Sequence, residues 1–157
     1  MSIDGRHLRD ALGRFATGVC VITTGDEGKP VAMTVNSFAS VSLDPPLILW
    51  SLQNNSDLHH RFSAPKHFAV NVLAKEQKEL ANLYAKKGDH ILQDDHYRVG
   101  KYGSPVIRNA LTTLECQLES SHDGGDHLII IGRVRDMHTR PTGLPLLFFS
   151  GAYRELH

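Results

Sequence analysis

The chain has 157 residues, and its 17 lysines and arginines balance its 17 aspartates and glutamates, so the formal charge is zero with neutral histidine. Nucleic-acid binding depends on clustered basic residues, and the sequence has no basic stripe, which argues against a nucleic-acid partner. The hydrophobic content of 41% and charged content of 22% are typical of a globular protein. We expect one folded domain over residues 1–157.

Membrane association and secretion are not expected. The longest apolar stretches, residues 128–131 and 146–149, are far shorter than the roughly 18 residues that cross a bilayer. The N-terminus lacks the basic-then-apolar layout of a secretion signal. Cys20 and Cys116 have no C-x-x-C partner, so we expect small buried side chains in a reducing compartment. These features predict a cytoplasmic protein.

The chain begins with a predicted amphipathic helix over residues 4–16, with Asp4 as N-cap and an end near Gly18. Its apolar side chains recur at helical spacing: Leu8, Ala11, Leu12 and Phe15. Strands rich in β-branched and aromatic residues are predicted next, at 19–24, 31–38, 47–52 and 68–73.

Two helical interruptions follow the first strands, one opening at Ser56 and one over about 76–87. The remaining predicted strands are 111–119, 127–136 and 146–153, with Gly124-Gly125 and residues 141–143 as breaks. So many strands in a small domain indicate a closed or partly closed barrel, because closure removes exposed edges.

Small hydroxyl and amide side chains are dense over residues 33–42. They let a planar ligand approach the backbone, and the hydroxyls are suited to holding a ribityl chain or phosphate. The alternative is a solvated strand face in which Ser and Thr pair across strands.

A second candidate lies at Asn55 and Ser56, where a strand ends and a helix is predicted to begin. A helix N-terminus accepts anions, and Lys86 and Lys87 add positive charge. The alternative is that Ser56 is a simple N-cap and that the lysines are only solubilising. Asp57 weakens a phosphate site if its carboxylate points inward.

His127 follows Gly124-Gly125-Asp126 at the entrance of an apolar strand. Histidine exchanges protons near neutral pH, so it suits a ligand site or a proton-donating role. The alternative is a turn histidine paired with Asp126. Near the C-terminus, residues 150–153 place small residues beside Tyr153, as a packing strand or the wall of a flat pocket.

The sequence shows no zinc signature, nucleophile elbow, P-loop or dinucleotide-binding glycine motif. The best local metal cluster among ten histidines is His90, Asp94, Asp95 and His96, and we predict no metal there. A chain without an obvious nucleophile fits an enzyme whose reactive atoms belong to a cofactor.

Taken in order, several segments resemble the short-chain flavin reductases from about residue 6 to residue 156. The matching segments are residues 11–19, 34–46, 68–73, 114–116, 125–134 and 145–153. Leu58 and Ile91 depart from the family pattern, where a hydroxyl and a phenylalanine are common.

The resemblance implies a mainly β fold with short helices, a Greek-key split β-barrel of the FMN-binding type, working as a homodimer. It implies that NADH or NADPH reduces FMN or FAD, and that a separate oxygenase component receives the reduced flavin. A flavin-binding carrier or sensor without turnover is the alternative.

Carried onto this chain, the resemblance assigns Met33, Thr34, Val35 and Asn36 to the flavin ring. Ser40, Val41 and Ser42 are assigned to the ribityl and phosphate portion, with Asn55, Ser56 and Lys87 as further phosphate contacts. His127 is assigned to the nicotinamide side as the catalytic residue, and Tyr153 closes the pocket from the last strand.

Overall fold

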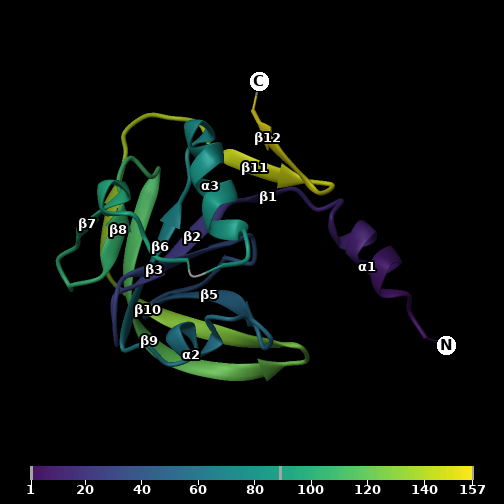
Figure 1. The fold of residues 1–157 in the computed structure, drawn as a ribbon, viewed down its shortest axis with the longest axis horizontal. Coiled ribbons are helices and arrows are strands. Elements are labelled where there is room, and N and C mark those ends of the chain that lie inside the picture. The colour runs from purple at the N-terminus through teal and green to yellow at the C-terminus, as the bar shows by residue number, and fades with distance from the viewer. Residues whose placement is uncertain (1, 89, 157) are drawn as a thin grey trace.

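The computed structural model describes residues 2–88 and 90–156. Within them, three short α-helices and two 3-10 helices interrupt a fold of strands (Figure 1). The strands are β1 (Thr17–Gly18), β2 (Cys20–Thr24), β3 (Val31–Val35), β4 (Ala39–Leu43), β5 (Pro46–Gln53), β6 (His67–Val72), β7 (Tyr97–Val99), β8 (Pro105–Ile107), β9 (Thr112–Gly124), β10 (His127–Thr139), β11 (Leu146–Phe149) and β12 (Ala152–Glu155). The helices are α1 (Gly5–Leu12), α2 (His59–Phe62) and α3 (Lys78–Ala85), with 3-10 turns η1 (Lys75–Gln77) and η2 (Asp94–His96).

Seven strands form one antiparallel sheet in the order β3-β2-β6-β9-β10-β5-β4. Its centre is the long β9–β10 pair. β5 pairs with the first half of β10, so that Gln53 lies opposite His127. In the described residues the outer strands β3 and β4 do not pair with each other, so the predicted barrel is closed only in part.

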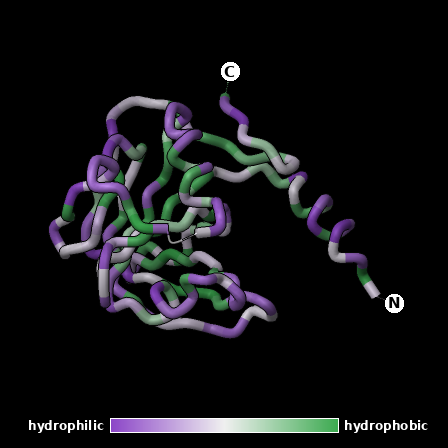
Figure 2. The backbone as a smooth tube through the Cα atoms, in the orientation of Figure 1, coloured by the Kyte–Doolittle hydropathy of each residue, from purple (hydrophilic) through white to green (hydrophobic). Residues whose placement is uncertain are grey.

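The main core lies on one face of this sheet, because side chains alternate between the two faces of a strand. Trp50 of β5 is fully buried and meets Phe62 and Phe68 edge-on, with ring centroids 5.8 and 6.4 Å away. Leu58 is buried in the same cluster, which explains an apolar residue at that position. Figure 2 shows hydrophobic stretches gathered in the interior strands.

A second core cluster lies beneath α3, whose buried residues are Ala81 and Tyr84. The Thr34 hydroxyl donates to the Ala81 carbonyl at 2.7 Å. This bond ties the middle of α3 to the end of β3, which sets one side of the site described below.

The cysteines confirm the expectation of small buried side chains. Cys20 and Cys116 are free and buried in the main core cluster. Burial raises the pKa of each thiol to about 12, so both stay protonated at neutral pH.

The N-terminal helix begins as predicted and ends early. The Asp4 carboxylate accepts from the Arg6 N–H at 2.9 Å and caps α1, but the helix ends at Leu12 instead of residue 16. Figure 1 shows α1 projecting from the sheets, and none of its residues is buried. In the described residues, no helix is long and apolar enough to cross a membrane.

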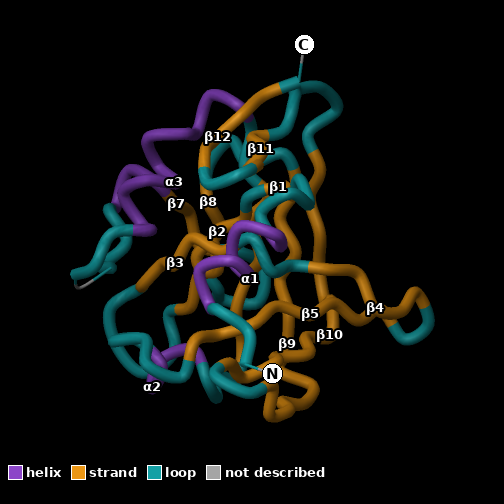
Figure 3. Tube along the Cα trace, turned by 90° about the vertical axis from the view of Figure 1, so that its right-hand side faces the viewer, coloured by secondary structure: helices purple, strands orange, loops and turns teal. Residues whose placement is uncertain are grey.

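Two further predictions need correction. Residues 146–153 are a hairpin of β11 and β12 instead of one strand, because Ser150 and Gly151 turn the chain at φ values of 49° and 78°. The helix predicted to open at Ser56 begins at His59 and has four residues. The edge strand β4, to the right in Figure 3, was not predicted, because the strand has only five residues, is partly polar and is mostly exposed.

Candidate functional site

A cleft of about 460 Å³ opens where β3 and β5 end, β10 begins and α3 ends. Its volume lies within the range of about 300–1,000 Å³ that small-molecule sites occupy. It brings together eight predicted residues: Met33, Thr34, Val35, Asn36, Asn55, Ser56, Lys87 and His127. The other lining residues are Ser37, Ser51, Gln53, Asp57, Tyr84, Ala85, Lys86 and His90.

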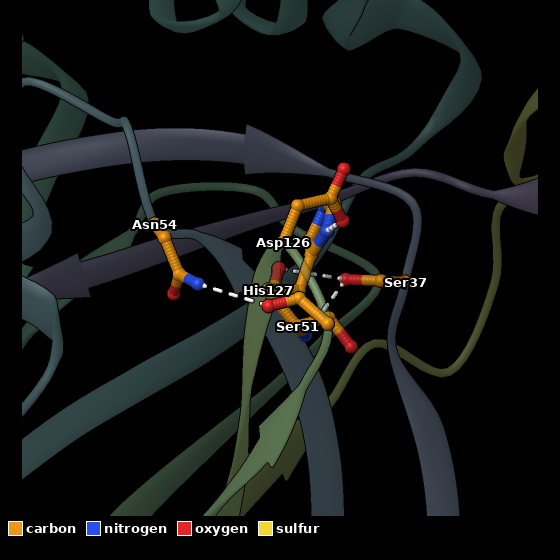
Figure 4. Close-up of polar contacts among 6 residues, drawn as sticks. Ser37, Ser51, Asn54, Asp126 and His127 are labelled. Carbon is orange, nitrogen blue, oxygen red and sulfur yellow. Dashed lines mark hydrogen bonds and ion pairs between the residues drawn. The ribbon is translucent and has the colours of Figure 1, made fainter. Parts of the chain in front are cut away.

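The ledge, defined as residues 33–37, forms one wall of the cleft and is fixed by side-chain hydrogen bonds. β4 pairs with β5 no further than Leu49, so β4 does not reach Ser51. The Ser37 hydroxyl takes that place, because it accepts from the Ser51 N–H at 2.9 Å and donates to the Ser51 carbonyl at 3.3 Å (Figure 4). The Ser37 hydroxyl therefore ties the end of the ledge to β5, while residues 33–35 are paired with β2.

His127 stands at the start of β10 and reaches the cleft with its ring about one-third exposed. Its Nδ1 lies 2.7 Å from an oxygen of Asp126 (Figure 4). This hydrogen bond lowers the pKa of the Asp126 carboxyl. A carboxylate only accepts, so Nδ1 carries the proton. The predicted pairing with Asp126 therefore exists, and it leaves the His127 Nε2 without a partner in the described part of the chain.

Asn54 holds the turn that carries His127, a role that sequence reasoning missed. Its backbone N–H donates to the Asp126 carbonyl at 3.0 Å, and its side-chain amide donates to the Gly125 carbonyl at 3.2 Å (Figure 4). The β9–β10 turn is thus bonded to the end of β5, which fixes the entrance of β10.

Asn55 and Ser56 line the cleft from the loop that follows β5. Ser56 is not the N-cap of α2, because that position is occupied by Leu58. Its hydroxyl instead accepts from the Leu58 N–H at 3.2 Å. The predicted helix-terminus anion site is therefore absent from this position, while the Ser56 side chain remains at the cleft.

Lys86 and Lys87 line the cleft at the end of α3 and are exposed. Neither lysine forms an ion pair within residues 2–88 and 90–156. Asp57 also lines the cleft and opposes their charge. The cleft thus combines a bonded ledge with free positive groups.

Four predicted contacts lie outside this cleft. Tyr153 borders a neighbouring pocket of about 180 Å³ that shares Thr34, Val35, Asn36 and Ala85 with the cleft. Its ring meets Phe148 edge-on at 5.5 Å, and burial raises the pKa of its hydroxyl. Ser40, Val41 and Ser42 lie on β4, which carries the chain away from the ledge, and they do not line the cleft.

The two histidines of the metal cluster considered above, His90 and His96, are hydrogen-bonded to other groups. His90 Nδ1 lies 2.9 Å from the Ala32 carbonyl, and His96 Nδ1 lies 2.8 Å from the Tyr84 hydroxyl. Among the described residues, no three His, Cys, Asp or Glu side chains converge on a metal position.

Three amide side chains at the cleft have unused hydrogen-bonding capacity. Asn36, Gln53 and Asn55 are exposed and line the cleft, and their side chains make no hydrogen bond to the described residues. An amide offers both donors and an acceptor. The cleft is therefore suited to a ligand with a polar ring edge and a phosphate.

Comparisons with known proteins identify the family of the chain. Residues 12–157 match the model of the flavin reductase like domain. FMN reductase (NADH) SmoA of Agrobacterium fabrum is 44% identical over 150 residues, which cover 96% of this chain and 85% of that protein. The reductase component of the flavin-dependent trigonelline monooxygenase of Acinetobacter baylyi is 42% identical over 94% of this chain and 48% of that protein.

A solved structure gives the same result for the fold. The NADH:FAD oxidoreductase SgcE6 of Streptomyces globisporus, in complex with NAD and FAD fragments, superposes with a TM-score of 0.91. It shares 35% sequence identity, with 100% of this chain and 97% of that chain covered. The expected split-barrel fold is confirmed, and the chain belongs to the flavin reductase family.

Proposed function

We propose that the chain is an NAD(P)H-dependent flavin oxidoreductase that reduces FMN or FAD and supplies the reduced flavin to a separate oxygenase component. The observation that carries the proposal is that the ledge and His127, far apart in the sequence, line one cleft. The oxygenase partner is supported by the name of the Acinetobacter relative, a reductase component.

The residues that line the cleft fit a flavin. When bound, a flavin supplies the hydride acceptor, and the protein binds and orients it. We assign Met33, Thr34, Val35 and Asn36 to the ring, because the ledge is anchored and the Asn36 amide is unused. We assign Asn55, Ser56 and Lys87 to the phosphate end, because they lie across the same cleft.

Three predicted contacts on β4 and one on β12 extend this assignment. Ser40, Val41 and Ser42 continue from the ledge, so they stay predicted contacts of the part of the ligand that leaves the cleft. Tyr153 borders the adjoining pocket and is predicted to close the far side of the ledge.

His127 is the predicted catalytic residue, because its Nδ1–H is held by Asp126 and its Nε2 is free to meet a nicotinamide. The test follows the absorbance of reduced nicotinamide with FMN and FAD, each with NADH and NADPH. No flavin-dependent oxidation in any combination rejects the proposal, and binding of flavin without turnover assigns the chain to the carrier class instead. We expect His127→Ala to lower turnover by roughly tenfold or more; unchanged nicotinamide kinetics would contradict the role of His127.

We also propose that residues 1–157 form one domain and that two copies associate through α1. Leu8 and Leu12 of α1 are 46% and 65% exposed, and Phe15, just after the helix, is 78% exposed. A helix with an uncovered apolar stripe is stabilised by a partner surface. Light scattering should give a dimer, and Phe15→Glu should shift it to monomer, whereas Asp10→Asn on the opposite face should not. A monomeric wild-type protein would reject the proposed dimer. The cytoplasmic location stays a prediction.

A further inference from the structure

His90 is a half-buried residue of the cleft lining whose position is fixed by the edge of β3. The Ala32 N–H donates to the His90 carbonyl at 3.0 Å, and the Leu92 N–H donates to the Pro30 carbonyl at 2.9 Å. Residues 90–92 therefore run along the start of β3 as a short extra edge.

The imidazole of His90 is oriented by Ala32, which also pairs with the His90 backbone. Its Nδ1 lies 2.9 Å from the Ala32 carbonyl oxygen, which can only accept. Nδ1 therefore carries a proton in both charge states of the ring. Nε2 has no partner within the described residues, so it is an acceptor in the neutral ring and a donor in the imidazolium.

The backbone at His90 has φ 55°, in the left-handed region that residues other than glycine seldom adopt. Such a conformation persists where surrounding bonds hold it, and it concentrates at functional positions. Here the two hydrogen bonds to Ala32 hold it. The ring is thus fixed in orientation without a bond to Nε2.

The charges around His90 favour an anion. Lys86 and Lys87 line the same cleft with no ion pair among the described residues. The other ionisable groups of the lining are Asp57 from the loop after β5, Tyr84 from α3 and His127 from β10.

We propose that His90 is a phosphate-binding residue, whose imidazolium Nε2–H donates to a phosphate oxygen of a bound nucleotide beside Lys86 and Lys87. The inference rests on the proposed function for the identity of the nucleotide, which is either the flavin or the pyridine nucleotide. Neutral Nε2 presents a lone pair to the phosphate, so binding favours the protonated ring.

The test is equilibrium binding by calorimetry, which needs no turnover, with ligand pairs that differ in phosphate. FMN is compared with riboflavin, and NAD+ with nicotinamide riboside. The variant is His90→Asn, because asparagine tolerates positive φ and its amide can donate to Ala32, but it cannot become charged. A charge-assisted hydrogen bond at a partly exposed site predicts a loss of roughly fivefold to tenfold for the phosphorylated ligand.

The outcomes distinguish the source of the phosphate. Weaker binding of FMN with unchanged riboflavin assigns His90 to the flavin, and weaker binding of NAD+ with unchanged nicotinamide riboside assigns it to the pyridine nucleotide. Thermal unfolding checks that the variant folds, and His90→Arg should recover part of the affinity.

Three results overturn the inference. They are unchanged affinity of His90→Asn for both phosphorylated ligands, equal losses for ligands with and without phosphate, and a wild type that shows no preference for phosphate. A protein that binds FMN through His90 but oxidises neither NADH nor NADPH with FMN or FAD would reject the proposed function and leave this inference standing.

Discussion

The cleft has two walls that differ in how their polar groups are bonded. In the strand wall, made of the ledge, Ser51, Gln53 and His127, hydroxyls and the histidine Nδ1 are bonded within the protein. In the loop wall, made of residues 55–57, 84–87 and 90, the Ser56, Tyr84 and His90 side chains are also hydrogen-bonded within the protein. The charged side chains of that wall, Asp57, Lys86 and Lys87, have no ion-pair partner among the described residues.

This difference indicates a division of roles. Ring systems that exchange a hydride must be held in a fixed mutual orientation, which a wall anchored in a sheet provides. A flexible phosphate is held by charge, and charge acts without one fixed geometry. The strand wall is thus suited to position rings, and the loop wall is suited to bind phosphate.

The largest effect is expected in the core of the sheet that carries the strand wall, at Gly132 of β10. A Cβ there would lie 2.6 Å from the Phe68 ring and 3.1 Å from the Cys116 Cβ, inside a closely packed core. We expect Gly132→Ala to lower the free energy of unfolding by about 1–3 kcal/mol, measured by urea denaturation. Gly18→Ala is the control, because a Cβ there meets nothing within 4 Å. Equal effects of the two changes would show that the core of this sheet adapts.

Ser37→Ala is expected to have the next largest effect, because it removes both hydrogen bonds to Ser51. An unsatisfied backbone N–H and carbonyl at a half-buried site predict a loss of about 1 kcal/mol in the free energy of unfolding. Riboflavin binding should weaken as well, since the ledge loses its anchor. Ser121→Ala on β9, where no side-chain hydrogen bond is lost among the described residues, is the matched control. Unchanged riboflavin affinity in Ser37→Ala would separate the ledge from ring binding.

The two walls also differ in how well the sequence predicts them. Alternating apolar residues predict the strands, and the dense hydroxyl and amide residues mark the ledge. The loop wall was predicted in part, through Asn55, Ser56 and Lys87. His90 has no local pattern that points to the cleft, because its position depends on pairing with β3, more than fifty residues earlier.

Smaller effects are expected in the loop wall. Lys86→Gln and Lys87→Gln should each weaken FMN binding by roughly threefold, because an exposed charge contributes little, and should leave riboflavin binding unchanged. The FMN effect should diminish at high salt, which screens exposed charges. Lys66→Gln, an exposed lysine outside the cleft, is the control. A loss that persists at high salt would indicate that the lysine fixes geometry, as in the strand wall.

The smallest effect is expected for Asp126, whose exposed side chain is hydrogen-bonded to His127 of the strand wall. Asp126 is 94% exposed, and the hydrogen bond to His127 lowers its pKa in the folded protein. Its contribution to stability is therefore present above the ordinary carboxyl pKa of about 3.9 and is lost as pH falls through the lower folded value.

Asp126→Asn tests that pair, because the asparagine oxygen still accepts from Nδ1–H and only the charge is removed. The difference in urea midpoint between wild type and Asp126→Asn should be small at pH 6 and should shrink further below pH 4. The same substitution in a His127→Ala background isolates the coupling between the two side chains. Should the difference survive without His127, the exposed aspartate acts through another group, and His127 owes its orientation to the Asn54 contacts with the turn.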